Sequence, residues 1–166
     1  INDQPPTVTV VLDAALVAHD RINCHPLVNT ATMTFDSGDL VAENTDEGND
    51  NVQTSVSYTL SDNVENLTLT GSASLTGTGN DLDNVLLGNT GSNVLDGSGG
   101  NDTLDGGSGG NDTLIGAAGD DTYRFGRGSG QDRVMEYDNT PGNVDTIEFG
   151  AGVATTDLLV TRDIDN

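Results

Sequence analysis

A nine-residue unit repeats between residues 79 and 134, and it constrains the fold more than any other feature of the chain. Each unit carries one aliphatic or aromatic residue near its end, and these residues are Leu86, Leu95, Leu104, Leu114, Tyr123 and Val134. The segment 106–115 contains one extra glycine, and the step to Val134 is irregular. A chain with a fixed period folds by stacking copies of one unit, because a single unit cannot bury its apolar residue alone.

Each unit divides into a polar turn of six residues and a strand of three residues with an apolar residue in the middle. A strand this short is not stable as an isolated hairpin. We expect two units to form one coil, so that units n and n+2 lie above one another at about 4.8 Å. Leu104 and Leu114 should then both point into the core although they belong to opposite edges of the stack.

The charge of the chain restricts its partners. There are 27 acidic residues against five Arg and no Lys, which gives a formal net charge of -22. Such a chain repels nucleic acid and anionic membranes, so we expect no nucleic-acid partner, and a cation is the natural one. Only 33% of the residues are hydrophobic, so an acidic disordered linker is the alternative interpretation, above all without metal.

The remaining composition limits how the fold is stabilised and exported. The single Cys24 cannot form an internal disulfide. No apolar run approaches the roughly 20 residues that span a bilayer. The first residues, INDQPP, lack the basic and apolar regions of a signal peptide, so we expect a signal outside this chain or another export route.

The turns combine the two kinds of ligand that calcium prefers. Ca²⁺ takes six to eight oxygens from carboxylates and backbone carbonyls. Glycines allow carbonyls to point inward, and an aspartate at the sixth position adds a carboxylate at the same rim. One turn supplies half a site, so two stacked turns should share an ion.

The units GSGGNDTLD (97–105), GGSGGNDTLI (106–115) and GAAGDDTYR (116–124) resemble the repeats-in-toxin (RTX) haemolysin-type nonapeptide G-G-x-G-x-D-x-U-x. The flanking segments GNDNVQTSVSYTL and VDTIEFGAGV also resemble that family, so the resemblance covers about 38–162. It implies an all-β fold, a right-handed parallel β-roll or β-helix solenoid with calcium-binding GGxGxD turns. It further implies several Ca²⁺ ions, a secreted or cell-surface bacterial protein, and type I secretion machinery as the partner during export.

The resemblance also implies the ligands, because each ion in the family lies between turns n and n+2. One site would use Ser98, Gly100 and Asp102 with Gly116, Ala118 and Asp121. A second would use Gly107, Gly110 and Asp112 with Ser129, Asp132 and the carbonyl of Arg127. Two weaker sites would pair Asn84 with Asp102 and Asn93 with Asp112, and would draw on Gly97, Gly99, Gly106 and Ser108. We expect Asp96 and Asp105 to cap turns, and leave the roles of Asp50 and Asp145 open.

We expect four regions along the chain: a linker with a short strand and helix at 1–37, degenerate coils at 38–86, RTX nonapeptide repeats at 87–134, and a capping segment at 135–166. The expected function is a non-catalytic calcium module with a structural, secretion or adhesion role, open to self-association or a cell-surface partner. The alternative is the C-terminal scaffold of a secreted RTX hydrolase, of protease or lipase type, whose catalytic domain precedes Ile1.

No catalytic group is expected within the chain. Cys24 and His25 are sequence neighbours, which is not a nucleophile and base arrangement. Residues 11–34, which include His25, resemble part of the trans-editing deacylases related to the prolyl-tRNA synthetase editing domain. That family relies on a lysine, which this chain lacks.

Overall fold

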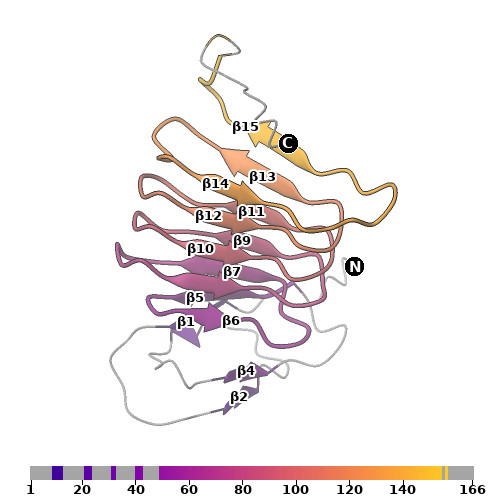
Figure 1. Cartoon of the computed structure of the whole chain (residues 1–166). Helices are drawn as coiled ribbons and strands as arrows, with labels where there is room; N and C mark the ends of the chain where they lie inside the picture. Colours follow the sequence, from indigo (N-terminus) through magenta and orange to yellow (C-terminus); the bar gives the residue numbers. More distant parts are fainter. Residues whose placement is uncertain are drawn as a thin grey trace, which may run out of the picture.

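The computed structural model describes residues 49–154 and 156, together with four short strands nearer the N-terminus. From residue 51 onward the chain forms a stack of parallel strands in which consecutive strands alternate between two sheets, so that strand n pairs with strand n+2 (Figure 1). The described residues contain no helix long and apolar enough to cross a membrane. The fold is the all-β parallel roll that the repeat predicts.

One sheet has eight strands, in the order β15 (Thr146–Phe149), β13 (Thr122–Phe125), β11 (Thr103–Asp105), β9 (Val85–Leu87), β7 (Asn66–Leu69), β5 (Asn51–Thr54), β1 (Thr9–Leu12) and β3 (Ala31–Thr32). The other has five, in the order β14 (Arg133–Met135), β12 (Thr113–Ile115), β10 (Val94–Asp96), β8 (Thr76–Thr78) and β6 (Tyr58–Thr59). A separate pair joins β2 (Arg21–Asn23) to β4 (Leu40–Ala42).

From β9 to β13 the core is a ladder of single apolar side chains, one from each strand. Leu104 pairs with Leu86 on one side and Tyr123 on the other, while Leu114 lies between Leu95 and Val134. Leu104 and Leu114 are both 0% exposed, although they belong to different sheets. The prediction that both point inward is therefore confirmed, because the nine-residue step places the same side of each strand toward the centre.

The turns stack with their backbones in close contact, and this explains the glycine at the fourth position. The carbonyl of Gly100 lies directly below Gly119, and the carbonyl of Gly110 lies below Gly130. A side chain at either upper position would collide with the carbonyl below it. The extra residue of the repeat 106–115 is Gly109, whose surroundings are open, so Gly110 occupies the fourth position.

The N-terminal part departs from the expected continuous stack. Leu40–Ala42, assigned above to the degenerate coils, pairs with Arg21–Asn23 instead of with the main sheets. Thr9–Leu12 falls where we expected a short strand within 1–37, and it joins the eight-stranded sheet beside β5. The short helix expected after this strand and the Cys24–His25 pair lie outside the described residues.

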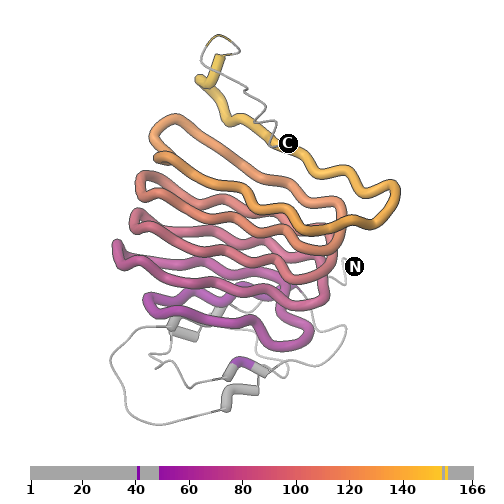
Figure 2. The backbone as a smooth tube through the Cα atoms, in the orientation of Figure 1, coloured from indigo at the N-terminus to yellow at the C-terminus, as the bar shows by residue number. Residues whose placement is uncertain are grey.

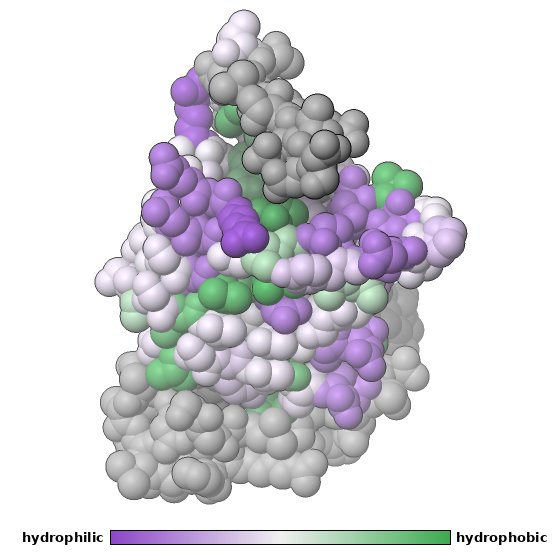
Figure 3. All heavy atoms as spheres, viewed as in Figure 1, coloured by the Kyte–Doolittle hydropathy of each residue, from purple (hydrophilic) through white to green (hydrophobic). Residues whose placement is uncertain are grey.

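At the C-terminal end, β15 adds one more strand to the stack. Ile147 is 53% exposed and Phe149 44% exposed, so this strand leaves apolar surface at the end of the roll. The loop between β14 and β15 projects beyond the turns below it (Figure 2). On the face shown in Figure 3, hydrophilic residues dominate the two rims, whereas apolar residues gather along the middle.

Candidate metal centre

The sixth residue of each turn lies immediately before a strand, so stacking places these residues in two columns. The first column runs along the eight-stranded sheet and contains Asn84, Asp102, Asp121 and Asp145. The second column runs along the five-stranded sheet and contains Asn93, Asp112 and Asp132. Carboxylates far apart in sequence thus become neighbours at each rim of the roll.

Hydrogen bonds hold the columns together through one carboxylate oxygen of each aspartate. In the first column, the backbone N–H of Asn84 donates to Asp102 Oδ1 at 2.8 Å, and that of Asp102 donates to Asp121 Oδ1 at 2.8 Å. In the second, the N–H of Asp112 donates to Asp132 Oδ1 at 2.9 Å. Every such bond fixes a carboxylate against the turn below.

In three of the repeat aspartates, the other carboxylate oxygen has no hydrogen-bond partner among the described residues. Asp102, Asp112 and Asp121 are each 1% exposed, and the Oδ2 atom of each accepts no hydrogen bond from any residue in the described part of the chain. A buried carboxylate oxygen without a partner is costly, and most such groups in proteins are paired, hydrogen-bonded or bound to a metal. These atoms fit a cation, which would supply the missing partner.

The first glycine of each repeat makes room at the same place. A Cβ added to Gly97 would overlap Asp102 Oδ2 and would lie 3.0 Å from the carbonyl oxygen of Gly116 in the turn above. A Cβ on Gly106 would overlap Asp112 Oδ2 in the same manner. A carboxylate oxygen of one turn and a carbonyl oxygen of the next therefore converge over a bare glycine, which is the mixed oxygen set that Ca²⁺ takes.

The predicted ligands of the first site lie on two stacked turns. Ser98, Gly100 and Asp102 lie between β10 and β11, while Gly116, Ala118 and Asp121 lie one turn above, between β12 and β13. The N–H of Ala118 donates to the carbonyl of Ser98 at 3.3 Å. Gly99 and Ala118 form an isolated parallel β-bridge between the two turns. The structure brings these residues together, and their role as ligands stays a prediction.

The predicted ligands of the second site also lie on stacked turns. Gly106 to Asp112 connect β11 to β12, and Arg127, Ser129 and Asp132 connect β13 to β14. Asp132 is only partly buried, and Ser108 is exposed at the tip of its turn. Asp132 is therefore less buried than Asp121, its counterpart in the first site.

Burial shifts the acidity of the same carboxyl groups. Desolvation raises the pKa of Asp102 to about 7, although the hydrogen bond from Asn84 opposes the shift, and the charge of Asp121 adds to it. Burial likewise raises the pKa of Asp112 and of Asp121 to about 6. Both rims thus concentrate poorly hydrated negative charge, which a bound cation would neutralise.

Comparison with known proteins agrees with this geometry. The family model described as the RTX calcium-binding nonapeptide repeat (4 copies) matches residues 78–110 and 107–132. These turns are RTX calcium-binding repeats. The match ends before β14, and no match to the chain was found among curated proteins or among solved structures.

The ninth-position aspartates of the RTX repeats accept hydrogen bonds from the backbone of the turns that follow them. Asp96 Oδ1 accepts a hydrogen bond from the N–H of Ser98 at 3.1 Å, and Asp105 Oδ1 accepts one from Gly107 at 2.9 Å. An aspartate that accepts from the backbone two residues ahead caps a turn. The expectation that Asp96 and Asp105 are turn residues is confirmed.

Two asparagines, which the repeat pattern did not single out, connect neighbouring turns through their side-chain amides. The side-chain amide of Asn89 donates to the carbonyls of Thr70 and Ala73 at 3.0 Å each. The amide of Asn80 donates to Ser61 and Val64 at 2.8 Å each. Both asparagines occupy the second position of a turn whose sixth residue is also asparagine, and that coincidence is the signal that could have revealed them.

The asparagine turns therefore differ from the aspartate turns in what links them to the layer below. An amide N–H₂ group satisfies two carbonyls of the lower turn, so the carbonyls there need no cation. The aspartate turns offer carboxylate oxygens without such a donor. The RTX stack thus passes from an amide-linked part near β8 and β9 to a carboxylate-rich part beyond β10.

Proposed function

We propose that this chain is a non-catalytic calcium-binding module of a secreted bacterial protein, which folds when it meets calcium outside the cell. The observation that carries the proposal is the set of buried, unpartnered Oδ2 atoms of Asp102, Asp112 and Asp121. These atoms lie within RTX calcium-binding repeats. The role of the module would be structural, in secretion, rigidity or adhesion.

We assign the two strongest repeat sites to the turns that carry paired aspartates. Asp102 and Asp121, with carbonyls of Ser98, Gly100, Gly116 and Ala118, would hold one ion. Asp112 and Asp132, with carbonyls of Gly107, Gly110, Arg127 and Ser129, would hold another. Where Asn84 or Asn93 replaces an aspartate, one charge is lost and weaker binding follows, because calcium affinity depends on the number of charged ligands.

The charge of the chain supports coupling between binding and folding. A net charge of -22 and a core one side chain wide leave little to offset self-repulsion and the entropy of ordering. Metal binding to a site that exists only in the folded state adds its free energy to folding. We expect a requirement of roughly 10⁻⁴ to 10⁻³ M calcium, the range of extracellular modules.

This calcium range would decide on which side of the membrane the module folds. In the cytosol, where free calcium is much lower, the chain would remain extended and could pass through the type I secretion machinery. Outside the cell it would fold. A second copy of the chain or a cell-surface partner could then dock on the folded roll.

The test is a titration of the isolated chain from excess chelator into calcium, followed by circular dichroism, with magnesium as the control for simple charge screening. We expect little β structure in chelator and a cooperative gain with calcium alone. Full β structure in excess chelator, or an equal response to magnesium, would refute calcium-dependent folding.

A further inference from the structure

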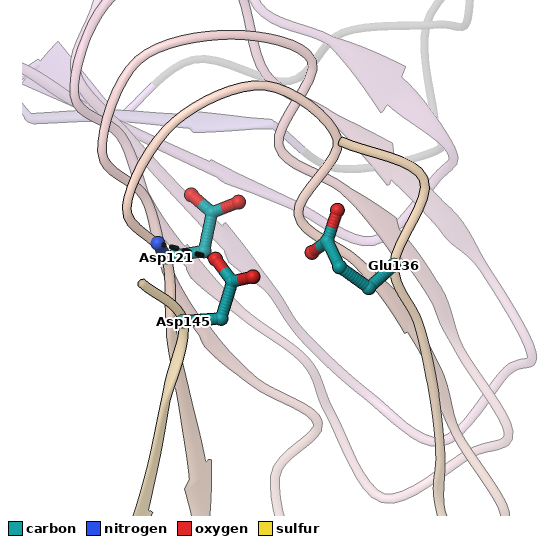
Figure 4. Close-up of side chains that lie close together, drawn as sticks. All are labelled: Asp121, Glu136 and Asp145. Carbon is teal, nitrogen blue, oxygen red and sulfur yellow. Dashed lines mark hydrogen bonds between the residues drawn. The ribbon is translucent and has the colours of Figure 1, made fainter. Parts of the chain in front are cut away.

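Three carboxylates meet at the C-terminal end of the roll, and they come from three different elements. Asp121 precedes β13, Glu136 follows β14, and Asp145 precedes β15. One carboxylate oxygen from each lies within 4.8 Å of the other two. Figure 4 shows the side chains around one small space, with the N–H of Asp121 donating to Asp145 Oδ1 at 3.0 Å.

Asp121, the buried member of this cluster, has one carboxylate oxygen without a hydrogen-bond partner among the described residues. Asp121 Oδ1 accepts from the N–H of Asp102, whereas Asp121 Oδ2 is buried and accepts no hydrogen bond from the residues that the structure describes. Asp121 is 1% exposed, so water gives little compensation. A ligand at this end must be a cation or a hydrogen-bond donor.

Glu136 is held in place by three hydrogen bonds. The hydroxyl of Tyr123 donates to Glu136 Oε2 at 2.7 Å, and the backbone N–H groups of Tyr137 and Asp138 donate to Oε1 at 2.7 Å each. Tyr123 is itself a buried member of the ladder. The carboxylate is thus positioned by the core of the roll and by its own loop, without support from a cation.

This end differs chemically from the repeat sites. The segment above Asp121, EYDNTPGNVD (136–145), is not a GGxGxD turn, and the RTX match ends at residue 132. Over Asp102 the turn above supplies the carbonyl of Gly116. Over Asp121 the longer loop supplies the carboxylate of Glu136 instead, so the site has three charged ligands where a repeat site has two.

We propose that Asp121, Glu136 and Asp145 bind a calcium ion of their own, which closes the C-terminal end of the stack. Oxygens that share one calcium lie at most about 5 Å apart, so the cluster needs little rearrangement. Three carboxylates bind Ca²⁺ more tightly than two, and this ion is the first to bind. The site shares Asp121 with the proposed repeat sites, whereas Glu136 and Asp145 lie outside them.

The experiment counts calcium ions on the full chain by native mass spectrometry and measures their affinities by equilibrium dialysis. Glu136→Gln should remove one ion and weaken the first binding step at least about tenfold. Asp145→Asn, which removes another carboxylate of the cluster, should lose the same ion. The matched control is Glu148→Gln, which deletes the same charge on β15, where Glu148 is 54% exposed and pairs with Arg124 at 2.7 Å.

The outcomes separate this site from the repeat sites. Wild-type ion number and affinity in both Glu136→Gln and Asp145→Asn would overturn the inference. A parallel Asp102→Asn variant reports on the repeats. If it leaves the ion count unchanged while Glu136→Gln lowers it, the repeat-site assignment fails and the terminal site stands. The reverse pattern leaves the repeats as the binding sites and refutes the terminal site.

Discussion

Aspartates of two kinds occur in the repeats, and their side chains have different surroundings. The Oδ2 atom of Asp102 is buried and accepts no hydrogen bond from the described residues, whereas Asp96 accepts one from the backbone N–H of Ser98. The first residue is costly to bury alone and gains from a cation. The second stabilises the turn whether or not metal is present.

We therefore expect Asp102→Ala to raise the calcium concentration at the folding midpoint several-fold, because it removes a charged ligand. Asp96→Ala should cost only about 1 kcal/mol, the contribution of one hydrogen bond. Calcium titrations of both variants, followed by circular dichroism, make the comparison. Equal midpoints would show that the sixth position has been assigned to the wrong residue.

At this scale the sequence predicted the repeat aspartates well and the terminal cluster poorly. The sixth position follows directly from the nine-residue period, so Asp102, Asp112 and Asp121 could be placed at the rims without a structure. Glu136 could not, because its approach to Asp121 depends on the path of a loop that breaks the period. Asp145 was left open for the same reason, since it belongs to a single degenerate copy.

The strands β9 to β12 contribute one buried side chain each, so the loss of one side chain removes the whole contribution of its strand to the core. Leu104 is 0% exposed between Leu86 and Tyr123, while Leu87 on the neighbouring strand is 39% exposed. We expect Leu104→Ala to cost about 2 to 5 kcal/mol and to raise the calcium requirement. Leu87→Ala should change both much less. Urea unfolding at saturating calcium measures the costs, and similar values for the two variants would contradict the ladder.

The amide-linked turns should respond differently from the carboxylate turns. Asn89→Ala leaves the carbonyls of Thr70 and Ala73 without their donor, which should cost about 1 to 3 kcal/mol. The number of bound calcium ions should not change, because the amide replaces a cation instead of binding one. Native mass spectrometry and urea unfolding together test this. Loss of an ion in Asn89→Ala would place a metal site where the amide lies.

Periodicity predicted the strands from β9 to β14 because turn, glycine and apolar residue recur in register. The asparagine amides escaped it because an asparagine in a glycine-rich turn is also an ordinary turn residue. Only the stacked geometry shows that the Asn80 and Asn89 amides reach the layer below. The pairing of β4 with β2 was missed because Leu40–Ala42 carries no repeat signature.

The whole molecule should respond to pH in a direction fixed by the buried carboxyls. Without metal, the folded-state pKa of Asp102 is about 7 and those of Asp112 and Asp121 are about 6, above the value of about 4 for an unfolded aspartate. The folded state therefore binds more protons than the unfolded state between about pH 4 and 7. Stability of the metal-free fold should rise as the pH falls through that window.

Calcium-free protein prepared by dialysis should thus gain β structure between pH 8 and pH 5, as measured by circular dichroism. Asp102→Asn should flatten the upper part of this profile, near pH 7, because it removes the group with the highest pKa. A profile that does not change with pH, or one that gains structure as the pH rises, would contradict the shifts.

Because strand n pairs with strand n+2, successive repeats belong alternately to one sheet and to the other. Deleting one repeat, such as 97–105, would still let every later strand find a partner, but β12 would then stack on β9 and change sheets. Everything beyond the deletion would be turned by half a coil, so that the loop between β14 and β15 would leave the roll on the opposite face. Only the loss or gain of two repeats together preserves the facing of both ends. A roll of this kind can therefore lengthen or shorten during evolution in steps of a full coil without reorienting whatever its two ends hold.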